Sequence, residues 1–329
     1  MNITDGTEVN HPMNDSGLPV RHADRPVCVA VDWGTSRFRA HLVAESARLL
    51  DSVASDDGMS RAEPGGFEAV LTRMCGPWLA AHRGIPVLMA GMVGSRNGWR
   101  EVPYVPCPAG LAEIADSILS FEIAGGTRVA IVPGLVVDDA TADVMRGEET
   151  QILGVGVDDA VVVLPGTHSK WALLRNGRIE SFRTFMTGEV FGLFTHRSVL
   201  RLLAEPSIEG EAERAAFRAG LAAATAGGGL LHRAFFARAG VLTGKLAPCD
   251  VEPHVSGLLI GSEVGEAMKL APDDLPLVLV ADGIVATNYR EAIAAAGREV
   301  ELVDPERAFV DGLIRLARLG KGVSDVRVR

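Results

Sequence analysis

A strand order that occurs twice along the chain is the strongest constraint on its fold. In the first half, three short apolar segments separated by turn residues precede a segment with helical apolar spacing, and a buried strand follows. The predicted elements are strands at residues 27–31, 37–43 and 48–53, a helix at 66–81 and a strand at 86–90.

The second half repeats this order. Three strand-like segments precede the helices, and Asn176-Gly177 favours a type I′ hairpin between two of them. The predicted elements are strands at 160–164, 170–174 and 179–185, helices near 189–204, 211–225 and 257–271, a strand at 277–280, a helix at 286–296, a strand at 300–303 and a helix at 308–319. The repeat predicts an α/β protein with two duplicated βββαβαβ lobes.

The length of the chain, 329 residues, also favours two lobes over one core. We place the boundary near Gly147, with an N-terminal lobe at 27–147 and a C-terminal lobe at 148–319. Residues 1–26 and 320–329 are expected to be flexible tails. Ligands prefer the cleft between two such lobes, so the functional site is expected there.

Charge and hydropathy exclude several kinds of partner. The net charge of -10 and the pI near 5.3 argue against nucleic acid and anionic membrane, because these need clustered Lys and Arg. The longest apolar runs, such as residues 275–281, are far shorter than the roughly 20 residues of a membrane-spanning helix. An anionic small molecule would need a local cationic pocket.

The cysteines of the chain show no pairing pattern. Cys28, Cys75, Cys107 and Cys249 form no C-x-x-C motif, and no histidine stands at zinc-finger spacing. Reduced thiols are therefore expected, and residues 1–26 lack a signal-peptide pattern, so the sequence predicts a cytoplasmic protein. The oligomeric state stays open, with a homodimer as one option.

The turn after the first strand is the first candidate site. Asp32, Gly34, Thr35 and Ser36 offer a carboxylate, a close backbone approach and two hydroxyls, a set that suits Mg²⁺ together with phosphate. A plain β-turn is an equally good interpretation of this segment by itself.

A turn of the same form follows the first strand of the second half. The segment Pro165-Gly166-Thr167-His168-Ser169-Lys170 supplies a glycine, two hydroxyls and a lysine that suit phosphate oxygens. A hairpin turn is the alternative for this segment alone, and His168 could equally be a turn or core histidine. The presence of one such turn in each half strengthens the phosphate interpretation of both.

Glu148 begins a predicted helix at the lobe junction. A carboxylate there could accept the proton of a substrate hydroxyl while that oxygen attacks a γ-phosphate. The alternative is an acidic residue that only stabilises the helix dipole, which is common in a first helical turn.

A Gly-rich loop after the strand at 86–90 is the candidate substrate pocket. Ser95, Arg96 and Trp99 lie beyond the carboxyl end of this strand, where α/β folds collect ligands. Arg96 could bind a substrate carboxylate through its planar fork. An exposed arginine beside a packed tryptophan is the alternative.

Two glycine patterns are set aside. Residues 240–246 resemble a P-loop, but they have one spacer residue too few, and Leu246 stands where Ser or Thr must bind Mg²⁺. Gly257, Gly261 and Gly265 fall on one face of a helix and predict a close helix-packing seam.

Several motifs taken in order resemble the 2-dehydro-3-deoxygalactonokinase family of the sugar kinase, heat-shock protein 70 and actin superfamily. The resemblance runs from about residue 27 to residue 317. Its motifs are Asp32-Trp33-Gly34, Met89-Ala90-Gly91-Met92-Val93-Gly94-Ser95, Val144-Met145-Arg146-Gly147-Glu148-Glu149-Thr150-Gln151, Pro165-Gly166-Thr167-His168, Lys170-Trp171, Met186-Thr187-Gly188-Glu189 and Ser256-Gly257-Leu258-Leu259-Ile260-Gly261. The resemblance implies the two-lobed actin-like ATPase fold, which is ribonuclease H-like, and a kinase that uses ATP and Mg²⁺.

The wider resemblance to glycerol-kinase-like enzymes implies roles for single residues. Glu148 stands where that group has the Asp of Gly-Asp-Gln-Gln, which is its catalytic base, although Glu is one methylene longer. Arg96 matches the arginine of Gly-Ile-Thr-Asn-Gln-Arg, which contacts the substrate in that group. Arg39 and Arg146 stay alternatives for binding the substrate carboxylate.

The adenosine site is also implied by resemblance. Asp282, Gly283 and Asn288 are similar to the adenosine loop of that group, although Asp282-Gly283 differs from the Gly-Thr sequence expected in close relatives. Gly188 belongs to the Met186-Thr187-Gly188-Glu189 motif and completes the implied nucleotide-binding set.

The implied reaction is transfer of the γ-phosphate of ATP to the 6-hydroxyl of 2-dehydro-3-deoxy-D-galactonate, in galactonate and galactose catabolism. Asp32 would hold Mg²⁺, the two turns would bind phosphates, and Glu148 would act on the hydroxyl. A kinase for 2-dehydro-3-deoxygluconate, which differs at one stereocentre, is the nearest alternative. A nucleotide-gated phosphohydrolase or binding protein on the same fold is the rival from another class.

Overall fold

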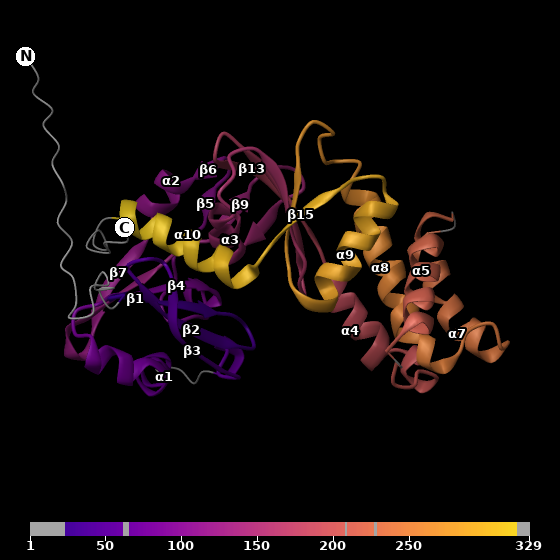
Figure 1. The fold of residues 1–329 in the computed structure, drawn as a ribbon, viewed down its shortest axis with the longest axis horizontal. Coiled ribbons are helices and arrows are strands. Elements are labelled where there is room, and N and C mark those ends of the chain that lie inside the picture. Colours follow the sequence, from indigo (N-terminus) through magenta and orange to yellow (C-terminus); the bar gives the residue numbers. More distant parts are fainter. Residues whose placement is uncertain (1–23, 62–65, 208, 227–228, 321–329) are drawn as a thin grey trace, which may run out of the picture.

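The computed structural model describes residues 24–61, 66–207, 209–226 and 229–320. In these ranges the chain forms two six-stranded sheets, a small three-stranded sheet and the helices around them (Figure 1). The tails predicted at 1–26 and 320–329 lie almost wholly outside the described residues, although Pro26 already belongs to the first strand.

The first large sheet has the strand order β3-β2-β1-β4-β8-β7. Its strands are β1 Pro26–Trp33, β2 Phe38–Ala44, β3 Leu49–Ser55, β4 Val87–Gly91, β7 Leu119–Ile123 and β8 Thr127–Ile131. Strand β1 pairs antiparallel with β2 and parallel with β4, while β2 pairs antiparallel with β3 and β4 parallel with β8.

The second large sheet has the strand order β15-β14-β11-β12-β13-β6. Its strands are β6 Ala109–Gly110, β11 Ala160–Leu164, β12 Ser169–Arg175, β13 Arg178–Phe185, β14 Leu277–Val280 and β15 Val300–Val303. The β11–β12 and β12–β13 pairs are antiparallel, and the β11–β14 and β14–β15 pairs are parallel. Five strands of each sheet, β3-β2-β1-β4-β8 in the first and β13-β12-β11-β14-β15 in the second, share the same order and directions, which confirms the predicted duplicated, actin-like fold. The sixth strands differ, because β7 pairs with β8 in the first sheet and β6 pairs with β13 in the second.

The remaining elements surround these sheets. The small sheet contains β5 Val105–Pro106, β9 Leu135–Val137 and β10 Asp143–Met145. The α-helices are α1 Phe67–Ala81, α2 Leu111–Asp116, α3 Glu148–Gly154, α4 Thr187–Arg197, α5 Glu211–Thr225, α6 Leu230–Ala234, α7 Phe236–Leu242, α8 Val251–Ala267, α9 Gly283–Ala295 and α10 Pro305–Leu319. The 3₁₀ turns are η1 Met59–Arg61, η2 Met92–Gly94, η3 Ala124–Gly126, η4 Val199–Leu202 and η5 Pro248–Asp250.

Helices α2, α3 and α10 pack in one core with the inner faces of both large sheets (Figure 1). Side chains alternate along β1, so that Cys28 and Ala30 contact this shared core while Val29 and Val31 contact the α1 side. Helix α10 lies at the C-terminal end of the described chain. It packs against α2 and α3, which are far from it in the sequence. The division of the lobes near Gly147 stays a prediction, since the core runs across it.

Helices α5, α8 and α9 cover the other face of the second sheet (Figure 1). Helix α8 approaches α5 closely, because a Cβ added at Gly257 would lie 2.0 Å from the carbonyl oxygen of Phe217. A Cβ added at Gly261 would lie 2.8 Å from the side chain of Ala224. The predicted glycine seam is confirmed at these two positions and is wrong at Gly265, where an added Cβ would meet nothing within 4 Å.

The main differences from the sequence prediction concern short elements. No element was predicted between residues 92 and 147, where the chain forms α2 and strands β5 to β10, and α6 and α7 were also not predicted. These strands have two to five residues, too few to show a period. Gly240 lies inside α7 and follows no strand, which confirms that residues 240–246 are no P-loop. Among the described residues, no helix is long and apolar enough to cross a membrane.

The close approach of α5 and α8 generates a stability prediction. Gly257→Ala would force a methyl group into the α5 backbone, and we expect a loss of about 2 kcal/mol in the free energy of unfolding. Gly265→Ala, in the same helix with open space around it, should gain up to about 1 kcal/mol because alanine favours helices. Urea unfolding of both variants checks this, and equal stability of the two would contradict the packing argument.

Candidate active site

The turn between β1 and β2 holds Asp32 at the end of a buried strand and leaves the hydroxyls exposed. The turn closes through a hydrogen bond from Gly34 N to Arg37 O at 2.9 Å, and Trp33 anchors it by donating from Nε1 to Asp57 O at 2.9 Å. Thr35 and Ser36 are exposed. The two hydroxyls therefore face solvent, where a ligand could reach them.

Two glycines bring the lobe junction against the end of β4. Gly91 has φ +99 and Gly147 has φ +112, values that L side chains rarely adopt. A Cβ added at Gly147 would lie 3.2 Å from Gly91 Cα, and one added at Gly91 would lie 2.8 Å from Trp33 O and 3.5 Å from Asp32 Oδ1. The start of α3 is thereby placed beside the Asp32 turn.

Asp32 and Glu148 share this junction. Asp32 Oδ2 accepts a hydrogen bond from Arg39 Nη1 at 3.2 Å. Burial raises the pKa of Asp32, the Arg39 guanidinium opposes this rise, and the Glu148 carboxylate adds to it. The electrostatic link between Asp32 and Glu148 shows that the predicted metal-binding and catalytic carboxyl groups lie near each other.

Glu148 is held from two sides. Its Oε2 accepts a hydrogen bond from the backbone N–H of Arg146 at 3.0 Å, and its Oε1 lies 3.2 Å from Lys170 Nζ in β12. The Glu148 side chain is 27% exposed, which leaves an accessible edge on the carboxylate. Glu148 thus connects the start of α3 with the strand that follows the second turn.

Glu149 is fully buried directly behind Glu148. Its Oε2 accepts a hydrogen bond from Gly147 N at 2.7 Å, and its Oε1 accepts one from Thr150 Oγ1 at 3.1 Å. The pKa of Glu149 is raised to about 7, mainly by burial and to a smaller extent by the adjacent Glu148 carboxylate. This carboxyl stabilises the strained turn at Gly147 and so fixes the position from which Glu148 extends.

The second turn packs on the start of α4. Glu189 N donates to Thr167 O at 3.0 Å, and His168 Nε2 lies 2.5 Å from Glu189 Oε2. A Cβ added at Gly188 would lie 2.4 Å from Gly166 O, so only glycine allows this approach. Gly166, Thr167 and His168 are exposed, which leaves this turn open to a ligand, as in the first turn.

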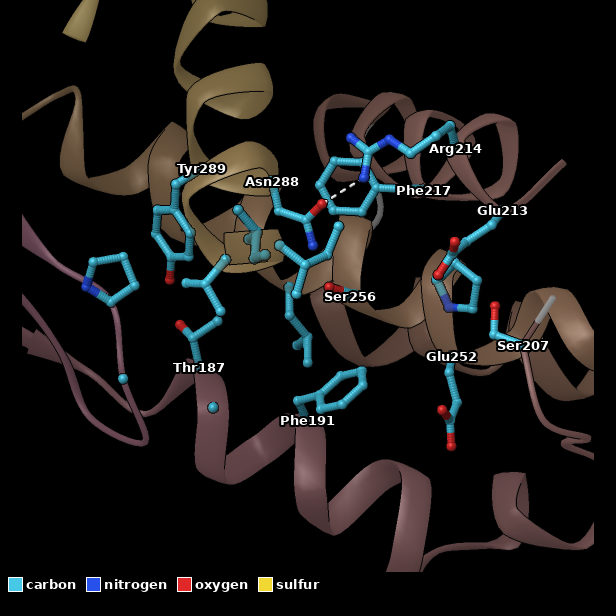
Figure 2. Close-up of a pocket in the computed structure, with 18 residues that line it drawn as sticks. Thr187, Phe191, Ser207, Glu213, Arg214, Phe217, Glu252, Ser256, Asn288 and Tyr289 are labelled. Carbon is cyan, nitrogen blue, oxygen red and sulfur yellow. Dashed lines mark hydrogen bonds between the residues drawn. The ribbon is translucent and has the colours of Figure 1, made fainter. Parts of the chain in front are cut away.

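A large cavity of about 410 Å³ lies beside the second turn, inside the second half of the chain (Figure 2). It is surrounded by α4, α5, α8 and α9, and its size is in the range of small-molecule pockets. Its lining residues are Pro165, Gly166, Thr187, Gly188, Phe191, Ser207, Glu213, Arg214, Phe217, Glu252, Pro253, Ser256, Leu259, Ile260, Ile284, Val285, Asn288 and Tyr289. The mostly apolar wall with a few polar groups suits a planar heterocycle.

Asn288 is oriented within this cavity. Its Oδ1 accepts a hydrogen bond from Arg214 Nη1 at 2.6 Å, as the dashed line in Figure 2 marks. Arg214 is itself fixed by an ion pair with Glu291 and by its position over the Phe217 ring, 4.6 Å from the centroid. The amide N–H groups of Asn288 are therefore available to a bound ring nitrogen.

The predicted nucleotide residues divide into two groups. Gly166, Gly188 and Asn288 line the cavity. Asp282 and Gly283 are exposed at the start of α9 and do not line it, although the next two residues, Ile284 and Val285, do. The structure thus brings the first group together around one cavity and leaves the second at its margin.

The predicted substrate residues are spread over a wider region. Arg96 is 86% exposed and lies 3.7 Å from Glu101, and Ser95 Oγ contacts Met59 Sδ at 3.3 Å. Trp99 stacks on Phe67 at a centroid distance of 6.2 Å, in an aromatic cluster with Trp33. The position of Trp99 is explained by its packing behind the first turn, whereas the exposed side chain of Arg96 could reach a ligand.

Arg39 and Arg146 differ sharply in environment. Arg39 is 52% exposed beside Asp32. Arg146 is buried, donates from Nη2 to Val102 O at 2.8 Å and stacks on the Tyr104 ring at 4.2 Å, while its Nε and Nη1 have no hydrogen-bond partner among the described residues. Arg146 therefore packs against the segment that contains Val102 and Tyr104, whereas Arg39 is the more accessible cation.

A buried network next to the cavity was missed by sequence reasoning. The Glu263 carboxylate accepts hydrogen bonds from Ser169 Oγ at 2.6 Å, Trp171 Nε1 at 2.8 Å and Tyr289 OH at 2.7 Å. It therefore ties α8 and α9 to the strand that follows the second turn. The signal in the sequence was the Glu263 carboxylate within the mainly apolar middle of α8.

The described residues contain no cluster of three or more His, Cys, Asp or Glu side chains that could hold a metal by themselves. Asp32 offers one carboxylate next to exposed hydroxyls, and Mg²⁺ often binds through one carboxylate, water and substrate phosphates. The residues present thus fit Mg²⁺ that arrives with a nucleotide.

On a duplicated actin-like fold, two open turns at a carboxylate-bearing junction and a cavity beside one of them are the arrangement of a carbohydrate kinase. Similarity to known proteins supports this class. The model of the family 2-keto-3-deoxy-galactonokinase matches residues 32–316. The chain therefore belongs to the 2-keto-3-deoxy-galactonokinase family, as its motifs indicate.

Individual relatives cover most of the chain. A Rhizobium meliloti (strain 1021) protein that carries the name 2-dehydro-3-deoxygalactonokinase DgoK1 is 36% identical over 296 residues, which span 88% of this chain and 96% of the relative. The 2-dehydro-3-deoxygalactonokinase of Escherichia coli (strain K12) is 35% identical over 292 residues, which span 88% and 97%. A crystal structure described as a 2-dehydro-3-deoxygalactonokinase protein from Sinorhizobium meliloti has a TM-score of 0.79 at 36% identity and covers 88% of this chain and 98% of its own.

The raised pKa of Glu149 predicts a pH-dependent stability. The folded protein keeps this proton up to about pH 7, whereas in the unfolded chain the carboxyl has its ordinary pKa of 4.5, so this carboxyl makes folding less favourable as the pH rises through that window. Glu149→Gln resembles the protonated form and should gain stability relative to the parent between about pH 5 and 8, by on the order of 2 kcal/mol. Urea unfolding of Glu149→Gln and of the parent, each at about pH 5 and at about pH 8, checks this.

Glu299→Gln, at an exposed carboxyl, is the matched control, and its stability difference from the parent should be the same at both pH values. If Glu149→Gln behaved in the same way, Glu149 would be ionised in the folded protein throughout this range.

Proposed function

We propose that this chain transfers the γ-phosphoryl group of ATP to the 6-hydroxyl of 2-dehydro-3-deoxy-D-galactonate. The observation that carries the proposal is the position of Glu148, whose accessible carboxylate stands at the junction between the Asp32 turn and the Lys170 strand. Family membership supports the sugar acid, and the relatives named above carry the same activity in their names. The proposed location is the cytoplasm, where ATP is available.

The adenosine part of ATP is proposed to bind in the large cavity. Gly166 and Gly188 form its edge toward the second turn, and Asn288 offers amide N–H groups from α9. Asp282 and Gly283 would contact the ribose side from the start of α9. This position directs the phosphate chain over the Gly166–Thr167–His168 turn, toward Glu148.

The phosphates are proposed to lie between the two turns. Gly34, Thr35 and Ser36 would donate from one half of the molecule, and Gly166 and Thr167 from the other. Asp32 would hold Mg²⁺ through water, and the ion would neutralise charge on the phosphate oxygens. Positioning and charge neutralisation would supply most of the rate acceleration.

The sugar acid is proposed to bind between the first turn and the loop after β4. Arg39 and Arg96 are the accessible cations for its carboxylate, with Ser95 and Trp99 nearby along the loop. Glu148 would accept the proton of the 6-hydroxyl as that oxygen bonds to the γ-phosphorus. The bond from this phosphorus to the β-phosphate bridging oxygen breaks, so ADP leaves and the 6-phosphate forms.

Glu148→Gln tests the proposed base. The amide keeps the shape of the side chain but cannot accept the proton, so turnover should fall by about 100-fold or more while ATP affinity changes little. Initial rates and calorimetric ATP titration measure the two effects, and Glu299→Gln should keep normal turnover. Retention of near-normal turnover would remove Glu148 from this role.

A substrate panel tests the proposed reaction itself. ADP release should depend on the added sugar acid, and 2-dehydro-3-deoxygalactonate should give a higher kcat/KM than 2-dehydro-3-deoxygluconate. A preference for the gluconate epimer would favour the alternative kinase. Equal ADP release without any sugar acid would favour a phosphohydrolase on the same fold.

A further inference from the structure

Lys170 is a buried cation with a specific partner at the lobe junction. Its side chain is 4% exposed, and its ammonium lies 3.2 Å from Glu148 Oε1. The same ammonium donates a hydrogen bond to His168 O at 3.2 Å, within the second turn. Lys170 thus contacts both the proposed base and the backbone of a proposed phosphate turn.

This burial is hard to explain by stability alone. Removing a lysine ammonium from water is costly, and a single ion pair often fails to offset that cost. The partner, Glu148, is itself 27% exposed, so the pair lies at the edge of an accessible space and not in a closed core. A functional role for the charge would account for its position.

The local charge also favours a role for Lys170. Asp32 and Glu149 both interact electrostatically with Glu148, so three carboxyl groups meet at the junction. Arg39 pairs with Asp32, and Lys170 is the cation whose side chain pairs with Glu148 in the part of the chain that the structure describes. An ammonium has three N–H donors, and the two contacts named above leave one for an incoming ligand.

We propose that Lys170 is a catalytic residue that binds an oxygen of the transferring phosphoryl group while it holds Glu148. This inference rests on the proposed function, since it concerns the same reaction. One ammonium that contacts both groups aligns the base on the acceptor side with the phosphorus on the donor side. Negative charge on the equatorial phosphoryl oxygens is thereby stabilised where it develops.

Lys170 takes part in the transfer step without exchanging a proton or a bond. The 6-hydroxyl proton passes to Glu148, the hydroxyl oxygen forms the new bond to phosphorus, and the bond to ADP breaks. Lys170 neither gains nor loses a proton, so it acts as a fixed charge.

Two neutral variants test this role. Lys170→Met removes the charge and the donors, and Lys170→Gln removes the charge but keeps a donor for Glu148. We expect both to lower kcat by about 100-fold or more, with the KM for the sugar acid changed by less than about threefold. Lys170→Gln retains a polar partner, so it still decides the question if the methionine variant fails to fold.

Lys269→Met is the matched control, because Lys269 is 70% exposed just beyond the end of α8 and also pairs with a glutamate. It should keep normal kcat and KM. Near-normal kcat in Lys170→Gln, or a raised KM for ATP with unchanged kcat, would overturn the proposal and leave Lys170 a structural or ground-state contact.

A double-mutant cycle separates this proposal from the proposed function. Parent protein that shows sugar-acid-dependent ADP release establishes the reaction first, independently of Lys170. In a Glu148→Gln background, Lys170→Gln should then lower kcat by less than about tenfold, because the two side chains act as a unit. A full 100-fold further loss would show independent action and contradict the shared role.

Discussion

The contact between α3 and α10 is the constraint on which the rest of the molecule depends. A Cβ added at Gly312 would lie 1.8 Å from Thr150 O, and one added at Gly154 would lie 1.8 Å from Ala308 O, so the two backbones touch through reciprocal glycines. Both helices pack in the core shared by the two large sheets. The last helix of the described chain therefore fixes the helix that begins with Glu148.

That fixed position gives the junction its chemistry. Gly147 turns the chain against Gly91, Glu149 holds the turn from inside, and Glu148 extends toward Asp32 and Lys170. The charged groups of Asp32, Glu148 and Lys170 come from three separate elements, β1, α3 and β12, which pack around the shared core. The cavity proposed for the nucleotide, by contrast, is lined only by residues of the second half, most of them on α4, α5, α8 and α9, so it rests on different packing contacts from the junction.

The sequence predicted the parts of this arrangement that have a local signal. Both strand repeats and the Asn176-Gly177 hairpin, which has positive φ at both residues, were recoverable because periodicity and turn chemistry act over a few residues. The family was recoverable because several of its motifs occur in order along the chain. The Lys170 contact with Glu148 and the Glu263 network could not be predicted, since they join residues far apart in the chain. The roles of the individual site residues stay predictions. Trp99 illustrates the reason, because an aromatic side chain in a loop can contact a ligand or pack in a core, and in the structure Trp99 packs with Trp33 and Phe67.

The most direct test of the account is a crystal structure with Mg²⁺ and a non-hydrolysable ATP analogue. The account predicts that the triphosphate contacts the Thr35 and Thr167 turns together, with the terminal phosphate near Glu148. A triphosphate bound to one turn only, with the other facing away from it, would contradict the account despite the family membership.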